Sequence, residues 1–179
     1  MPRIQPVDPA ANAAEAQLAT ARKMFGRAPN MVTTAAHSPA ALEGLLGLFA
    51  SLGKASLGPR LGEQIAIAVA QANGCGYCLS AHTAIGKLHG VSAADLDAAR
   101  RSAAGDAKAA AVLALATEIN RSRGHVDDAV LAAARAAGVT DAEVVETVAH
   151  VALNVFTNYL NNVTEPEIDF PRVDLGAAA

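Results

Sequence analysis

Apolar residues recur every three or four positions through most of the chain, and no stretch shows the strict alternation of a half-buried β-strand. The first such segment starts near Pro9 and ends at Phe25, and the last starts near Thr140 and ends near Asn161. We therefore predict an all-α fold, a single-domain helical bundle of roughly eight helices over residues 1–179. Residues 162–179 are expected to form an extended C-terminal tail laid on this body.

Several helix ends carry local signals. Ser38-Pro39 predicts a helix start, because serine caps free N–H groups and proline is tolerated at the first helical position. Thr140 and Glu143 have the spacing of a capping box at the start of the last helix. Gly74 is expected to end one helix and Gly90 the next, so the core segment 61–90 is predicted to fold as two helices joined by a tight turn.

Composition narrows the classes of partner. Hydrophobic residues make up 52% of the chain and aromatic residues 3%, and the formal net charge of −3 is not gathered into blocks. Such a chain is not expected to bind nucleic acid or an anionic membrane surface. The N-terminus lacks the apolar core of a signal peptide, and no uncharged apolar run reaches the ~18 residues of a membrane span. We therefore expect a cytoplasmic location, where paired cysteines indicate redox or metal chemistry.

The segment 61–90 contains the residues with chemical reactivity. It holds the only two cysteines of the chain, Cys75 and Cys78, with His82 four positions after the second. Glu63 lies twelve positions before Cys75 in an otherwise apolar run. On a helix, Cys78 and His82 share a face. Cys75 falls at the first turn, where unpaired N–H groups and the helix dipole favour a thiolate.

A carboxylate in an apolar helix needs a partner or a proton, because removing its charge from water is costly. Antiparallel packing of the two helices would bring Glu63 near His82. We interpret the set as a Glu–His–Cys relay in which Glu63 orients His82 and His82 activates Cys78. Cys78 would attack an oxidant, and Cys75 would resolve the sulfenic acid to a disulfide.

Other interpretations of these residues stay open. The cysteines with His82 and His89 could bind zinc, but their spacing fits no structural zinc pattern and crowds four ligands onto one helix, so we predict no metal. The cysteines could be incidental core residues, and His82 could be a satisfied core histidine. Glu63 could form a salt bridge with Arg60 or with another helix. His89, at a helix end, is typical of a partner for the helix dipole.

A second polar stripe follows the last predicted helix. His150, Asn154 and Asn158 are spaced four apart among apolar residues, so they share one face. This stripe either makes hydrogen bonds between helices or a contact between subunits, or it forms a wall of the active pocket. Tyr77, between the cysteines, either shields the thiols or touches substrate. We take Tyr77, His150 and Asn154 as candidate substrate-pocket residues.

The pattern E-x11-C-x2-C-x3-H, formed here by Glu63, Cys75, Cys78 and His82, resembles the core of the alkylhydroperoxidase D family. This family belongs to the carboxymuconolactone decarboxylase superfamily. Asn73-Gly74, before the first cysteine, is also similar to the family. The ending FTNYLNNVTEPEIDFP resembles its peroxidase-related branch.

The resemblance implies an alkylhydroperoxidase D-like helical fold that assembles as trimers or hexamers. It implies a thiol peroxidase without metal, haem or other cofactor, in which Cys78 is peroxidatic, Cys75 is resolving, His82 is the base and Glu63 is the relay carboxylate. In well-known relatives a histidine stands at the position of Tyr77. The reductant of relatives can be a lipoyl-bearing protein. The decarboxylase branch typically lacks the cysteine pair.

The predicted function is therefore a thiol-dependent peroxidase of antioxidant defence. It would reduce a small hydroperoxide through a Cys75–Cys78 dithiol/disulfide cycle supplied by a dithiol reductant. The alternatives are a decarboxylase or lactone-processing enzyme that uses His82 and Glu63 in acid–base chemistry, and a non-enzymatic redox sensor or helical binding module.

Overall fold

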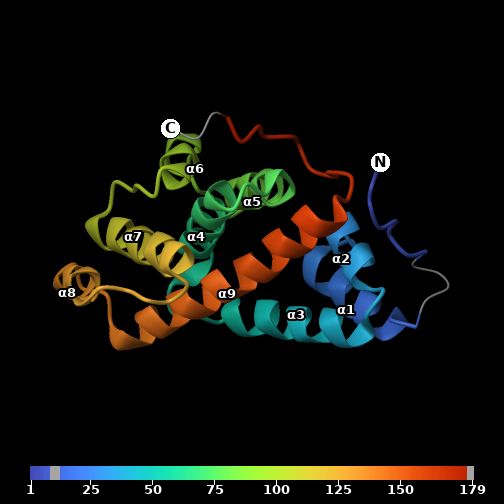
Figure 1. Ribbon diagram of the computed structural model, residues 1–179, viewed down its shortest axis with the longest axis horizontal. Coiled ribbons are helices and arrows are strands. Elements are labelled where there is room, and N and C mark those ends of the chain that lie inside the picture. The colour runs from blue at the N-terminus through green and yellow to red at the C-terminus, as the bar shows by residue number, and fades with distance from the viewer. Residues whose placement is uncertain (9–12, 177–179) are drawn as a thin grey trace.

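The computed structural model describes residues 1–8 and 13–176 (Figure 1). Within these residues the chain forms nine α-helices and no β-strand, which confirms the predicted all-α fold. The helices are α1 (Glu15–Phe25), α2 (Asn30–Ala35), α3 (Pro39–Leu52), α4 (Gly58–Ala72), α5 (Gly76–Leu88), α6 (Ala93–Arg100), α7 (Ala107–Ser122), α8 (Asp128–Ala136) and α9 (Asp141–Thr164). The predicted start of the first helix, Pro9, lies outside the described residues. The last helix runs three residues beyond its predicted end.

The helix starts follow the local signals in the sequence. Ser38 Oγ accepts a hydrogen bond of 3.3 Å from the N–H of Ala41 at the start of α3. At α9, Thr140 Oγ1 accepts from the N–H of Glu143 at 3.2 Å, and Glu143 Oε2 accepts from the N–H of Thr140 at 2.8 Å. The predicted capping box is therefore confirmed, and it starts a helix of 24 residues.

Helix α4 lies at the centre of the arrangement and packs against α5, α6, α7 and α9 (Figure 1). Because it has neighbours on several sides, Ile67 is fully buried although it points away from the face that Ile65 and Val69 share, and those two are fully buried as well. Helix α9 crosses the molecule and also contacts α2, α3, α5 and α7. No helix in the described part of the chain combines the length and the apolar character needed to cross a membrane.

Two glycines allow the helices around the site to approach closely. A Cβ at Gly62 of α4 would lie 3.0 Å from Cε1 of His150 on α9. A Cβ at Gly86 of α5 would lie 2.6 Å from Cδ2 of Leu96 on α6 and 3.6 Å from the Cβ of Glu63 on α4. The missing side chains therefore let α4 approach α9 closely at Gly62 and let α5 approach α6 closely at Gly86.

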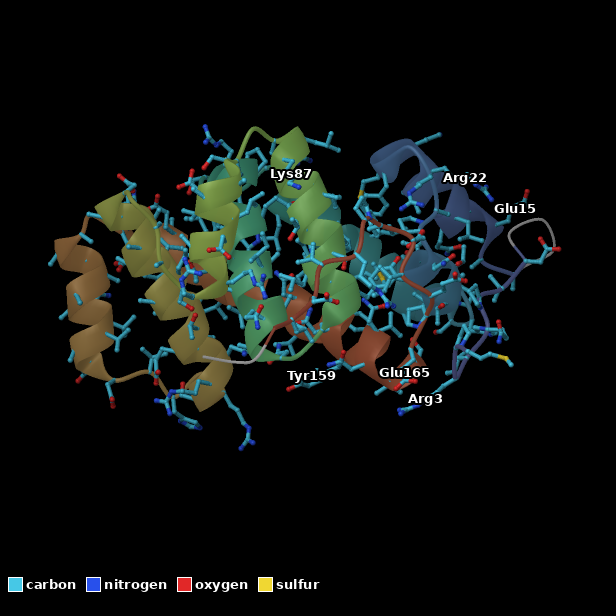
Figure 2. The ribbon with its side chains drawn as sticks, turned by 90° about the horizontal axis from the view of Figure 1, so that it is seen from above. Arg3, Glu15, Arg22, Lys87, Tyr159 and Glu165 are labelled. Carbon is cyan, nitrogen blue, oxygen red and sulfur yellow. A yellow bond between two sulfur atoms is a disulfide. The ribbon has the colours of Figure 1, made fainter. Side chains whose placement is uncertain are left out.

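The extended tail after α9, described to residue 176, lies across α5 (Figure 2). The N–H of Val173 donates to Ser80 Oγ of α5 at 3.0 Å. Arg100 of α6 donates to the carbonyl oxygens of Asp174 and Leu175 at 2.9 and 2.7 Å. Residues 165–176 are not helical, whereas residues 162–164, predicted to belong to the tail, continue α9 to Thr164. Residues 177–179 of the predicted tail lie outside the described residues.

Candidate redox site

The turn between α4 and α5 places the first cysteine. Gly74 adopts a positive φ of 65°, a conformation that glycine reaches without steric cost. The N–H of Cys75 donates to the carbonyl of Ala70 at 2.9 Å, and the N–H of Gly74 donates to that of Gln71 at 3.3 Å. These two bonds form a Schellman motif, which ends α4 and sets Cys75 as the N-cap of α5.

The two cysteines are joined by a disulfide bond in this structure. Their Cα atoms lie 5.3 Å apart, within the range that a disulfide spans without backbone movement. The N–H of Cys78 donates to Cys75 Sγ at 3.1 Å, so an unpaired donor of the helix start faces sulfur. Both side chains are buried, with exposed fractions of 0% for Cys75 and 2% for Cys78.

One turn after Cys78, α5 presents His82 to α4. Nδ1 of His82 lies 2.8 Å from Oε2 of Glu63, and the two side chains are 15% and 16% exposed. The structure thus brings together the predicted carboxylate and imidazole, and Glu63 pairs with His82 rather than with Arg60. Because one ring nitrogen is held by the carboxylate, the other is left for proton exchange. Within the described residues, no hydrogen bond joins His82 to either sulfur.

A side chain that sequence reasoning missed contacts the second sulfur. Nδ2 of Asn161, near the end of α9, donates to Cys78 Sγ at 3.2 Å. Asn161 is only 4% exposed, and its Oδ1 is buried without a hydrogen-bond partner. The polar stripe at His150, Asn154 and Asn158 would have pointed to Asn161 if it had been continued by a further helical step of three.

An asparagine cluster fixes the turn before the cysteines. Asn73 exchanges side-chain hydrogen bonds with Asn120 of α7, at 2.9 and 3.3 Å, and donates to Oδ1 of Asn158 at 3.0 Å. Asn162 donates to the carbonyl of Asn73 at 3.0 Å. This cluster ties the end of α4 to α7 and α9, so the predicted role of Asn158 in helix-to-helix hydrogen bonding is the one the structure gives.

Tyr77 points away from the imidazole, toward α2 and the tail. Its hydroxyl donates to Oδ1 of Asp169 at 2.6 Å and accepts from the N–H of Met31 at 3.1 Å. Burial, together with the hydrogen bond to the Asp169 carboxylate, raises the pKa of Tyr77 well above its usual value. The Tyr77 hydroxyl therefore keeps its proton throughout the neutral pH range, and it donates this proton in the hydrogen bond to Asp169 of the tail.

Arg27, which precedes α2, holds Asp169 from its other side. Arg27 lies 2.9 Å from Oδ2 of Asp169, and its guanidinium stacks over the ring of Phe170 at 4.6 Å. The Phe170 and Tyr77 rings meet edge to face at 5.8 Å. Tyr77 is thus held in place by α2 through its hydroxyl and by the tail through both its hydroxyl and its ring. Sequence reasoning missed Asp169 and Arg27, and nothing local to Tyr77 indicated them.

The other two candidate pocket residues lie along α9. His150 is buried beside Gly62, and its Nε2 has no hydrogen-bond partner. Burial lowers the pKa of His150, the charge of Glu146 and that of Glu63 oppose this, and the charge of His82 adds to it. Asn154 donates from Nδ2 to the carbonyl of His150 at 2.8 Å, a bond within its own helix. His150 therefore belongs electrostatically to the site, whereas the Asn154 amide is used locally.

Within residues 1–8 and 13–176, no group of three or more His, Cys, Asp or Glu side chains is arranged to hold a metal ion. Two surface hollows lie away from the disulfide. One is between α1 and α3, and the other is among α5, α6 and the tail. Neither is lined by Tyr77, His150 or Asn154.

Residues 39–120 match the sequence model of the carboxymuconolactone decarboxylase family. Over this segment, the chain is similar to that family. The match includes Glu63, both cysteines and His82, so the resemblance seen in the motif is confirmed. No curated protein matches the chain significantly.

Solved structures extend the likeness of the fold beyond the matched segment. A structure described as the alkylhydroperoxidase AhpD core of an uncharacterized peroxidase-related protein from Ralstonia eutropha superposes with a TM-score of 0.83 and 23% identity, covering 94% of this chain and 92% of the other. The debrominase Bmp8, in complex with 2,3,4-tribromopyrrole, superposes with a TM-score of 0.78 and 22% identity over 93% and 91% of the two chains. An uncharacterized peroxidase-related protein from Silicibacter gives 0.77 and 21% over 91% of each. At these identities the comparisons show a shared fold.

Proposed function

We propose that the protein is a thiol-dependent peroxidase that reduces hydroperoxides through a Cys75–Cys78 dithiol/disulfide cycle. The observation that carries the proposal is the disulfide at the start of α5, one helical turn from the Glu63–His82 pair. Two cysteine thiols that form a disulfide within the folded protein can give two electrons to an oxidant. An imidazole held by a carboxylate can take a thiol proton and return it to a leaving group.

The cycle balances with these groups alone and an external dithiol. In the reduced protein His82 takes the proton of the Cys78 thiol, and the thiolate attacks the terminal oxygen of the hydroperoxide. The O–O bond breaks, the Cys78 sulfenic acid forms, and the alkoxide leaves as the alcohol with the proton of His82. The Cys75 thiol then displaces water from the sulfenic acid, and a dithiol reductant restores both thiols by exchange.

Consumption of tert-butyl hydroperoxide with a dithiol reductant tests this function. The wild type should turn over, and Cys78→Ser should reduce the rate to the uncatalysed level. Cys75→Ser should leave a sulfenic acid on Cys78 that dimedone traps. Equal rates for wild type and Cys78→Ser would refute the proposal. Activity on a carboxylated lactone that survives loss of both thiols would favour the lactone-processing alternative instead.

A second candidate is reductive dehalogenation, favoured by the likeness to the debrominase Bmp8. The same dithiol contains the two electrons that replace a ring bromine by hydrogen, giving bromide, a proton and the disulfide. Bromide release from a bromopyrrole, measured beside hydroperoxide consumption with the same reductant, separates the two functions. A higher specificity constant for the bromopyrrole would replace the peroxidase proposal with this one.

The proposal includes a dithiol reductant, such as a lipoyl-bearing protein, and a cytoplasmic location, because each turnover needs a compartment that regenerates thiols. Dihydrolipoamide and thioredoxin, compared as reductants at equal thiol concentration, identify the preferred class. A rate with dihydrolipoamide no higher than the rate with a monothiol would remove the lipoyl-type partner from the proposal.

We further propose a homo-oligomer that buries the outward face of α9. Between Thr147 and Thr164 this helix has no Asp, Glu, Lys or Arg, although it crosses an open side of the molecule (Figure 1). Its exposed apolar side chains repeat every three or four positions, and they are Val145, Val148, Ala152, Phe156, Tyr159 and Val163. Tyr159 projects from the body (Figure 2), and it is 58% exposed. Val148→Glu combined with Val163→Glu should shift the sedimentation of the protein to that of a monomer, and unchanged sedimentation would contradict this interface.

A further inference from the structure

We propose that Asn161 is a catalytic residue of the thiol site. Its amide N–H stabilises the Cys78 thiolate, and its amide oxygen binds the O–H of the incoming hydroperoxide. The second part rests on the proposed peroxidase function, and the first part concerns the thiol alone. The two parts follow from the two ends of one buried amide.

The donor end of the amide faces the reacting atom. Nδ2 of Asn161 lies 3.2 Å from Cys78 Sγ, and no other side chain in the described residues donates to this sulfur. A disulfide sulfur has no proton to give, so an amide turned the other way would place two acceptors together. When the disulfide is reduced and Cys78 ionises, the same N–H faces a full negative charge. A hydrogen bond to an ion is about twice as strong as one between neutral groups.

The acceptor end of the same amide is unused. Oδ1 of Asn161 is buried and has no partner, which is uncommon because an unpaired buried acceptor destabilises the fold. It belongs to the side chain that contacts sulfur, so it lies beside the space in which an oxygen bonded to that sulfur would form. The hydroperoxide oxygen that Cys78 attacks carries a hydrogen, and the resulting sulfenic acid keeps it. Both species supply the O–H donor that Oδ1 lacks.

The position of Asn161 is fixed from outside the site. Its backbone carbonyl accepts from the N–H of Glu165 at 2.8 Å, and the carbonyl of Thr164 accepts from the N–H groups of Arg3 and Ile4 at 2.9 and 3.2 Å. An ion pair of 2.8 Å between Arg3 and Glu165 adds to this tie, and Figure 2 shows the two side chains close together. The end of α9 is therefore held to the N-terminal segment, so the amide is oriented before substrate arrives.

The first test measures the thiol without a peroxide. In a Cys75→Ser background, Asn161→Leu replaces the amide by an apolar side chain of similar size, and iodoacetamide alkylation of Cys78 is followed against pH. We expect the midpoint of the profile to move to higher pH and the rate at pH 7 to fall about tenfold. Mere loosening of the fold would expose the sulfur and raise the rate.

Asn158→Leu in the same background is the matched control. Asn158 is an equally buried amide one turn earlier on α9, and it bonds to Asn73 rather than to sulfur. We expect the midpoint of its alkylation profile to coincide with that of the parent, because Asn73 keeps its bonds to Asn120 and Asn162 and the turn stays in place. Where Asn161→Leu fails to fold, Asn161→Asp serves instead, because it keeps the shape, removes the donor and should move the midpoint in the same direction. A profile of the Asn161 variants that coincides with the parent overturns the role in the thiolate.

The second test isolates the acceptor end. At a pH above both midpoints Cys78 is fully ionised in parent and variant, so the two should react equally fast with iodoacetamide. Sulfenic acid formation with tert-butyl hydroperoxide should still be about tenfold slower in Asn161→Leu, because the O–H acceptor is gone. Equal slowing with both reagents overturns peroxide binding by Oδ1. If the wild type consumes no hydroperoxide at all, the proposed function fails, and the alkylation profiles still decide the thiolate role.

Discussion

On the side of α5 that meets α4, His82 and Glu63 share a hydrogen bond of 2.8 Å and stay partly open to solvent. On the side that meets the tail, Tyr77 and Asp169 share one of 2.6 Å, and burial keeps the tyrosine proton in place. Both pairs join α5 to another element through an acid, but only the first contains an imidazole, the side chain suited to proton exchange, and keeps some exposure to solvent. The disulfide lies between a side suited to proton exchange and a side suited to structure.

The largest effect should come from the proton-exchanging side. His82→Gln keeps a polar side chain of similar size but cannot carry a proton between thiol and leaving group. We expect the specificity constant for tert-butyl hydroperoxide to fall about a hundredfold at pH 7, with little change in the free energy of unfolding. Steady-state kinetics with a saturating dithiol measures it.

The control for this variant is His89→Gln, since His89 is exposed at the end of the same helix. Its specificity constant should equal that of the wild type. If the specificity constant of His82→Gln falls no more than that of the control, the imidazole takes no part in the reaction. The two sides of α5 then do not differ in the way proposed.

The structural side should respond in stability. Tyr77→Phe leaves the buried N–H of Met31 without an acceptor and takes a donor from Asp169. We expect the free energy of unfolding in urea to fall by about 2 kcal/mol. Because the pKa of Tyr77 is raised in the folded state, the unfolded chain ionises first, and the wild type should lose stability above about pH 10 while Tyr77→Phe loses less.

The chain offers a matched control in its only other tyrosine. Tyr159→Phe removes a hydroxyl from an exposed ring, and its unfolding free energy should stay within about 0.5 kcal/mol of the wild type. Hydroperoxide turnover of Tyr77→Phe at pH 7 should stay within about threefold of the wild type. A tyrosine with a raised pKa keeps its proton at this pH and so does not act as a general acid or base. A large kinetic loss with unchanged stability would reverse the assignment of the two sides.

How well each contact could be predicted from the sequence depends on how far apart its two residues lie along the chain. The helix starts at Ser38 and Thr140 are set by residues three positions away, and the α4–α5 turn by Gly74, so local patterns placed them. The Glu63–His82 contact spans 19 positions but joins two helices across one tight turn, so their antiparallel packing is enough to bring the pair together.

Contacts set by global packing could not be reached in this way. Asn161 meets Cys78 across 83 positions, and Asp169 meets Tyr77 across 92. Asn161 depends on the angle at which α9 crosses α5, which follows from close approaches such as that at Gly62 rather than from any motif. Asp169 lies in an extended segment without periodicity, so its direction is fixed only by the partners it finds.

The smallest expected effect separates two histidines on the proton-exchanging side. Burial lowers the pKa of His150, so the folded protein protonates His150 at lower pH than the unfolded chain, whose histidine has its ordinary value of about 6.5. Stability should therefore fall as the pH drops through this range, and His150→Asn should lose less than the wild type between pH 7.5 and 5.5 in urea titrations. His125→Asn, at an exposed position, should keep the wild-type difference, and equal differences in all three proteins would contradict the assignment.

The charge of His82 pushes the pKa of His150 in the same direction as burial, so a proton taken from the thiol by His82 makes a second proton nearby less favourable. One proton on His82 at a time is what the first step of the proposed cycle requires.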